Sequence, residues 1–275
     1  MPMRKISFNL VFGLMVSISF IVAVSLSSNG HSMDLIAFKT ANNLYNKGKY
    51  DEAIQIFENL TAETQSSSAL YFNLGNAYHM KGDMGHALLN YRRALRLDPR
   101  DQEIRNNIRI LQAENNDLIN EAVASRSLIY SIADLTGRIF SFNETAILTL
   151  GLWFLIFVLI LFFQMSKTFI MRVIVFACLF MSATLFLIVG LSLGSRIIVE
   201  EIKPSAVVTA VEIPLSSQPG EAYISDHYLE SGAEVFLVDA QGGWVKLSTM
   251  GNTEEGWVPA ASVELVANTT TSSGL

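Results

Sequence analysis

Two long runs without a charged residue constrain this chain more than any other feature. Residues 146–163 and 173–194 consist mainly of Leu, Ile, Phe, Val and other uncharged residues. Each run is about as long as a helix needs to be to cross a hydrocarbon layer of roughly 30 Å, at a rise of about 1.5 Å per residue. Burying both runs inside a soluble protein would require a large covering domain that the 275-residue chain lacks. We therefore predict transmembrane helices at residues 145–163 and 173–194.

The loop between these runs, residues 164–172, carries Lys167 and Arg172 and no acidic residue. Short cationic loops stay in the cytoplasm. The N-terminus favours the same orientation, because residues 1–27 combine a basic start with a long apolar stretch and small residues, as in a signal peptide or an uncleaved signal anchor. We therefore expect a multi-pass protein of the bacterial inner (cytoplasmic) membrane whose soluble parts both face the periplasm.

The first soluble region repeats itself with a period of 34 residues. Pairs of matching residues at this distance are Gly48 and Gly82, Ala53 and Ala87, and Asn42 and Asn76. The pattern indicates helix-turn-helix units in which a glycine ends the first helix and small residues lie where paired helices cross. It resembles the tetratricopeptide repeat family. Within residues 34–116 we predict two such repeats and a capping helix that begins at the N-cap Asp101.

The resemblance implies that the first helix of each repeat lines a concave groove for an extended or helical peptide. The groove residues are then Phe38, Asn42, Tyr45, Phe72, Asn76 and His79. A carboxylate clamp of the kind that some tetratricopeptide domains use is disfavoured, because Phe38 and Asn106 stand in place of lysines and Ile110 in place of an arginine. Two repeats bury little surface alone, so a partner or the membrane is expected to add burial.

A basic stretch runs from the end of the second repeat into the capping helix and is made of Arg92, Arg93, Arg96, Arg105 and Arg109. One interpretation is a solvated face, partly paired with neighbouring acidic residues. The other is a surface for an acidic partner or for anionic headgroups. Next come residues 117–144, where apolar residues at helical spacing indicate a linker or an interfacial helix, lying on the membrane or packing against the repeats.

The last soluble region, residues 203–267, alternates apolar and polar residues in short runs separated by glycine-containing turns. It resembles a small SH3-like β-barrel. Between Glu200 and Ala267 the chain has eleven acidic residues and two lysines, so this surface should avoid anionic headgroups. Trp244 and Trp257 either line a ligand groove or belong to the barrel core. The tail, residues 268–275, is polar and is expected to be disordered.

The order of these parts resembles BatE-type proteins of the Bacteroides aerotolerance (Bat) group. The fold class is then a multi-domain α + β membrane protein: a tetratricopeptide array, a two-helix transmembrane hairpin and a C-terminal SH3-like barrel. The resemblance implies protein partners among von Willebrand A-type Bat proteins and a MoxR-type ATPase system. It also implies a role in oxidative-stress tolerance or envelope assembly.

Function is predicted from what each region offers chemically. The sequence presents no nucleophile–base pair, phosphate loop or metal-ligand spacing, so we expect a non-enzymatic scaffold or adaptor without a cofactor or metal. Nucleic acid is not an expected partner, because the net charge is −6. The alternative is an envelope sensor or anchor that binds peptidoglycan through the SH3-like region.

Overall fold

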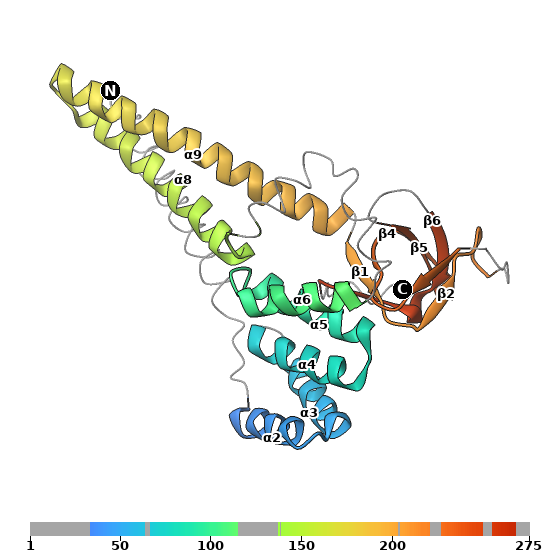
Figure 1. The fold of residues 1–275 in the computed structure, drawn as a ribbon. Helices are drawn as coiled ribbons and strands as arrows, with labels where there is room; N and C mark the ends of the chain where they lie inside the picture. Colours follow the sequence, from blue (N-terminus) through green and yellow to red (C-terminus); the bar gives the residue numbers. More distant parts are fainter. Residues whose placement is uncertain are drawn as a thin grey trace. The chain divides into compact units, whose positions relative to one another are not determined.

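The computed structural model describes residues 34–63, 67–114, 137, 139–202, 204–220, 227–249 and 255–267, with side chains at 198–202 left out. The chain divides into two compact units. Figure 1 draws the helices and strands of both, coloured along the sequence. The first contains Phe142–Leu193, and the second contains Ser32–Ser141 together with Gly194–Leu275. The predicted signal segment, the C-terminal tail and most of the linker before residue 137 lie outside the described residues.

Two helices are long and apolar enough to cross a membrane. They are α8 (Phe142–Met165) and α9 (Phe169–Ile202), and the apolar part of α9 reaches Ile197. Within the most apolar stretch of each helix, 0% and 11% of the residues are buried by protein. A soluble core helix would be covered by protein, whereas the faces of α8 and α9 are open to their surroundings.

The turn between α8 and α9 is short and held by its own polar groups. The Ser166 amide and hydroxyl both donate to the Phe162 carbonyl at 3.0 Å, which ends α8. The Nε of Arg172 donates to the Ser166 carbonyl at 3.0 Å, which fixes this cation at the turn, and both Lys167 and Arg172 are exposed.

The repeat array consists of paired helices. Its helices are α2 (Leu35–Asn46), α3 (Tyr50–Glu63), α4 (Ser68–Lys81), α5 (Met84–Leu97) and α6 (Gln102–Glu114). Asp101 accepts hydrogen bonds from the amides of Glu103 and Ile104, which confirms it as the N-cap of α6. Gly48 and Gly82 have φ angles of 74° and 85°, so both turns use the left-handed conformation that favours glycine.

Small residues lie where the helices of the array cross, as the repeat pattern predicts. Ala41, Ala53 and Ala87 are fully buried. A Cβ atom at Gly75 would come within 2.7 Å of the Tyr91 ring, so only glycine fits between α4 and α5 without displacing that ring. The large core side chains that pack around these positions include Phe57, Leu70, Leu88 and Tyr91.

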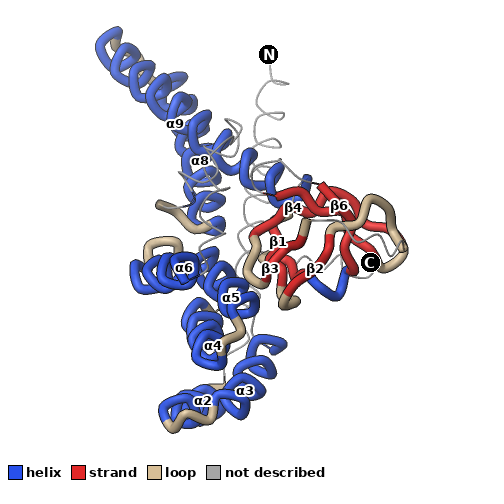
Figure 2. Tube along the Cα trace, turned by 45° about the vertical axis from the view of Figure 1, so that its right-hand side comes forward, coloured by secondary structure: helices blue, strands red, loops and turns tan. Residues whose placement is uncertain are grey.

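The C-terminal region is an antiparallel β domain. Its strands are β1 (Ser205–Val208), β2 (Glu212–Pro214), β3 (Tyr228–Glu230), β4 (Glu234–Gln241), β5 (Trp244–Thr249), β6 (Glu255–Pro259) and β7 (Val263–Leu265). Five of them form a sheet in the order β6-β5-β4-β1-β7, and β2 pairs with β3. Figure 2 shows the strands in red. One bridge, between Ser216 and Trp257, joins the pair to β6, and the described strand pairs do not close a barrel.

Turn chemistry fixes the register of the central hairpin. Gly242 and Gly243, both with positive φ, connect β4 to β5, and Gln241 pairs with Trp244. Two consecutive residues with positive φ give a turn whose twist matches that of the flanking strands. This register points Val245 and Leu247 into the core of the β domain.

Candidate functional site

The first helices of the pairs, α2, α4 and α6, share a ladder of asparagine side chains. The Asn73 amide donates to the Asn42 carboxamide oxygen at 2.9 Å. The Asn107 amide donates in the same way to Asn76 at 3.0 Å. Donor and acceptor are each shifted by 34 residues between the two bonds, so α6 repeats the geometry of a first helix. We call the face built by α2, α4 and α6 the first-helix face.

The aromatic residues predicted for the groove are half-buried and packed within the array. Phe38 lies against Phe57 with ring centroids 6.0 Å apart, and Phe72 lies 5.9 Å from Tyr91. Tyr45 lies 5.6 Å from Tyr50. Their exposed edges remain available to a ligand, but much of each ring serves packing between the helices of a pair.

The polar residues predicted for the groove have partners inside the array. Asn76 accepts from the Tyr91 hydroxyl at 2.7 Å as well as from Asn107. His79 lies 3.1 Å from the Glu114 carboxylate. An Asn76 oxygen with two donors cannot turn away to bind a ligand without leaving buried donors unpaired, which would cost about 1–3 kcal/mol. This geometry gives a further reason against a carboxylate clamp. The ligand-binding role of the first-helix face stays a prediction.

A second arrangement joins the array to the β domain through α5, and we call it the seam. The Arg92 guanidinium makes a two-pronged ion pair with Glu234 at the start of β4, where Nη2 lies 2.9 Å from Oε2. The Glu234 side chain is only 13% exposed. Paired, planar donors match a carboxylate well, and the low exposure strengthens the attraction relative to a surface pair.

A charge cluster lies beside this pair. Arg93 donates to the Glu264 carboxylate at 3.2 Å and to the Leu265 carbonyl at 2.9 Å. His86 lies between two carboxylates, with Nδ1 at 2.8 Å from Asp83 and Nε2 at 3.6 Å from Glu264. We call Asp83, His86, Arg93 and Glu264 the seam cluster.

The protonation of the seam cluster follows from these contacts. The hydrogen bond to Asp83 and the Glu264 carboxylate at 3.6 Å raise the pKa of His86 to about 9, although burial opposes the rise. The nearby His86 ring lowers the pKa of Glu264, and Arg93 lowers it further. Burial raises the pKa of Asp83, but the hydrogen bonds from His86 outweigh it, and the net shift is downward. At neutral pH the cluster therefore holds two cations and two anions.

Tyrosines of α4 support both cations of the seam cluster. The Tyr78 ring stacks on His86 at 4.9 Å, and its hydroxyl donates to Glu58 of the preceding pair. The Arg93 guanidinium lies 6.0 Å from the centre of the Tyr71 ring. Cations gain energy over aromatic faces, so α4 helps to hold the charges that meet the β domain.

The seam also has a tight apolar part. Val207 of β1 is fully buried and belongs to the hydrophobic core of the array, with Val266 packed against it. The Gly85 amide donates to the Ser231 hydroxyl at 3.1 Å. A Cβ atom at Gly85 would lie 2.6 Å from the Val208 carbonyl. The β domain thus adds the burial that two repeats lack. The sequence had led us to expect this burial from a partner or from the membrane.

The basic stretch has a role that the sequence analysis did not specify. Arg92 and Arg93 pair with acidic residues of the β domain in the same chain. The two interpretations made from the sequence were pairing with neighbouring acidic residues and binding of a separate acidic partner or of headgroups. No local signal pairs them with Glu234 and Glu264, which lie 142 and 171 residues further along. The ladder residues Asn73 and Asn107 were also missed, although the 34-residue spacing of the repeats relates them.

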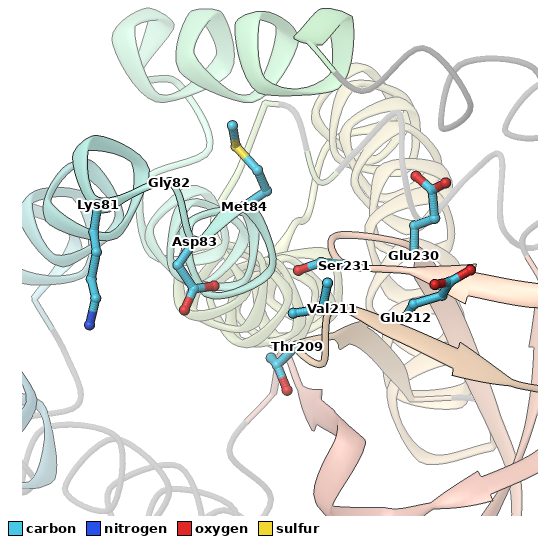
Figure 3. A pocket seen from close by; sticks show the side chains of 9 residues that line it. All are labelled: Lys81, Gly82, Asp83, Met84, Thr209, Val211, Glu212, Glu230 and Ser231. Carbon is cyan, nitrogen blue, oxygen red and sulfur yellow. The ribbon is translucent and has the colours of Figure 1, made fainter.

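The seam borders a cleft of about 580 Å³. Its lining comes from the α4–α5 turn and from the β1–β2 and β3–β4 connections, and comprises Lys81, Gly82, Asp83, Met84, Thr209, Val211, Glu212, Glu230 and Ser231 (Figure 3). The ammonium of Lys81 is paired with Asp51 at 2.6 Å, and Asp83 with His86. The cleft is open and acidic.

The two tryptophans predicted for the β domain lie on one face of its sheet. Trp257 is directly opposite Lys246, and Trp244 precedes Lys246 by two residues. Alternation along strands places all three on the side opposite the Val245–Val258 pair of the core. Trp257 is buried and Trp244 is half-buried, and the described core cluster of the β domain contains neither. A binding role for them stays a prediction.

These features define a helical-repeat protein with a β domain and two apolar helices. Residues 38–102 match the tetratricopeptide repeat family, so the array is of this type. A search of curated proteins finds no sequence that matches the chain.

The Arg92–Glu234 pair can be tested by a double-mutant cycle. Arg92→Gln should lower the free energy of unfolding by about 1–3 kcal/mol, because Glu234 is then left little exposed and without its cation. The double variant Arg92→Gln, Glu234→Gln should lose less than the sum of the single variants. Denaturant unfolding of the full chain in detergent measures all three.

Arg109→Gln is the matched control, since Arg109 is an exposed arginine of α6. It should change stability by less than about 0.5 kcal/mol. Equal losses for Arg92→Gln and Arg109→Gln would contradict the seam.

Gly85→Ala gives a test whose sign depends on the seam. On an isolated helix, alanine is more favourable than glycine by about 1 kcal/mol. At the seam the new methyl group would meet the Val208 carbonyl, the Thr209 Cα and the Ser231 hydroxyl, so we expect a loss of about 1–3 kcal/mol. Thermal unfolding of the full chain measures the change, and a stabilised variant would show that α5 and β1 do not meet this closely.

Proposed function

We propose that this protein is a non-enzymatic, membrane-anchored scaffold or adaptor that binds protein partners in the bacterial cell envelope. The observation that carries the proposal is the tetratricopeptide array, since arrays of this family generally mediate protein–protein interaction. The two apolar helices supply the anchor. The seam adds that the array and the β domain present one joined surface to a partner.

Orientation and location complete the proposal. The cationic turn with Lys167 and Arg172 is assigned to the cytoplasm, and the array and β domain to the periplasm. The turn is compact, and its two exposed cations are available to interact with headgroups on that side.

The particular system is proposed from the resemblance to BatE-type proteins of the aerotolerance group. The strand order and the bridge between Ser216 and Trp257 are compatible with an SH3-like region. Partners would then be von Willebrand A-type Bat proteins and a MoxR-type ATPase system. The second candidate, peptidoglycan binding, draws on the half-buried Trp244, which lies on the sheet face opposite the Val245–Val258 pair of the core.

Binding through the first-helix face can be tested with matched pairs of substitutions. The double variant Asn42→Ala, His79→Ala should lower capture of the protein's partners from detergent-solubilised membranes by about tenfold or more, because it removes polar groups from α2 and α4. Quantitative mass spectrometry after affinity capture of the full chain measures this.

The control is the double variant Gln55→Ala, Asn59→Ala. Both positions are exposed and lie on α3, the second helix of the first pair, away from the first-helix face. This control should leave capture unchanged. Equal capture by both double variants, with circular dichroism showing folded protein, would reject the role of the first-helix face.

Sedimentation of the full chain with isolated cell wall tests the second candidate, peptidoglycan binding. If peptidoglycan binds at Trp244, the Trp244→Ala variant should no longer sediment with the cell wall.

Orientation can be tested by labelling single cysteines in intact cells with a membrane-impermeant thiol reagent. In a Cys178→Ser background, a cysteine at Ser217 in the β domain should react, and one at Thr168 in the turn should react only after the cells are opened. Both positions are exposed, so burial does not explain a difference between them. The reverse pattern of labelling would overturn the periplasmic assignment.

A further inference from the structure

The seam contains two charge groups that respond differently to protons. Arg92 and Glu234 form a balanced pair of a permanent cation and a carboxylate. The seam cluster holds Asp83 and Glu264 against Arg93 and His86. Its charges sum to zero only while His86 is protonated, and loss of that proton leaves one negative charge in excess.

Groups from every neighbouring element surround His86. Asp83 lies on the preceding turn, with Lys81 nearby but paired to Asp51. Tyr78 of α4 stacks on the ring and is bonded to Glu58. Glu264, on β7, also faces Arg93. Of these partners, Glu264 alone belongs to the β domain, so the charge on His86 acts directly across the seam.

We propose that the seam cluster is a proton-controlled latch that fastens the β7 side of the β domain to α5. With His86 charged, Glu264 is held by two cations and the latch is closed. When His86 becomes neutral, Glu264 keeps only Arg93 and faces the carboxylate of Asp83 across an uncharged ring. The Arg92–Glu234 pair and Val207 keep their contacts, so the β domain loosens along one side and stays attached along the other.

The direction of the pH dependence follows from the raised pKa of His86. A group whose pKa rises from 6.5 to about 9 on folding contributes fully below pH 6.5, and its contribution is lost as the pH rises through 9. If the pKa of His86 returned fully to 6.5 when the latch opens, the equilibrium constant for latch closure would fall by about fiftyfold between pH 7 and pH 9.5. We expect about tenfold, because Asp83 stays beside His86 when the latch opens. Glu264 and Asp83 remain charged in mild acid, so the latch holds there.

Distances between spin labels on the array and the β domain can test the latch in the full chain, in lipid nanodiscs with Cys178→Ser. Labels at Gln55 on α3 and Gln241 at the end of β4 are both exposed. At pH 7 we expect one narrow distance distribution. At pH 9.5 we expect a broader distribution, because the ratio of molecules with an open latch to those with a closed latch rises about tenfold. Labels at Gln55 and Gln102, both within the array, should report an unchanged distance.

Variants make the result decisive. His86→Gln should give the broad distribution at both pH values, and Glu264→Gln should remove most of the pH dependence while keeping the shape of the side chain. Arg109→Gln should behave like the unchanged protein. An unchanged distribution between pH 7 and 9.5, or a pH response that survives in His86→Gln, would overturn the proposal. The measurement uses no partner, so its outcome is independent of the scaffold function.

Discussion

The contact between Val207 and the core of the repeat array is the constraint on which the rest of the unit that contains the array and the β domain depends. A helical repeat buries its apolar face only against a neighbour, and two repeats leave one face short of cover. Here β1 supplies a fully buried side chain to that core, and α5 carries a glycine where the strand passes. The β domain therefore takes a structural part in the array, as an additional repeat would in a longer one.

Charge then determines how the β domain sits on α5. Val207 and Val266 give burial that is largely indifferent to rotation, whereas a two-pronged arginine–carboxylate pair requires one orientation. Arg92 with Glu234 sets one point, and Arg93 with Glu264 sets a second. The second point is made by one guanidinium nitrogen that donates to both Glu264 and the Leu265 carbonyl, and together the two points restrict the position and angle of the β domain on α5. An acidic β domain and a basic helix, which the sequence presents as separate features, are the two halves of this contact.

Features that depend on local periodicity, such as the helix pairs and their turns, could be predicted from the sequence. The seam depends on contacts between distant residues and could not. The 34-residue period predicted the helix pairs, the glycine turns at Gly48 and Gly82 and the small residues at the crossings, because each is repeated. Alternation and glycines predicted most strands of the β domain. The seam joins residues more than 140 positions apart, and no repeated pattern marks which arginine meets which glutamate. Gly85 is the residue whose identity most clearly indicates the seam. It lies in the first turn of α5, where the helix itself does not need a glycine, so a close neighbour is the remaining reason for one.

Helix α4 connects the two candidate surfaces of the unit that contains the array and the β domain. Asn73 and Asn76 on α4 take part in the asparagine ladder of the first-helix face. Tyr71 and Tyr78, from the same helix, contact Arg93 and His86 of the seam. Both sets of contacts use buried or half-buried side chains, which cannot shift without disturbing their neighbours. A ligand on the first-helix face that moved α4 would therefore change the packing beneath both seam cations. By reciprocity, a change in the seam would alter the affinity of that face for the ligand by the same factor.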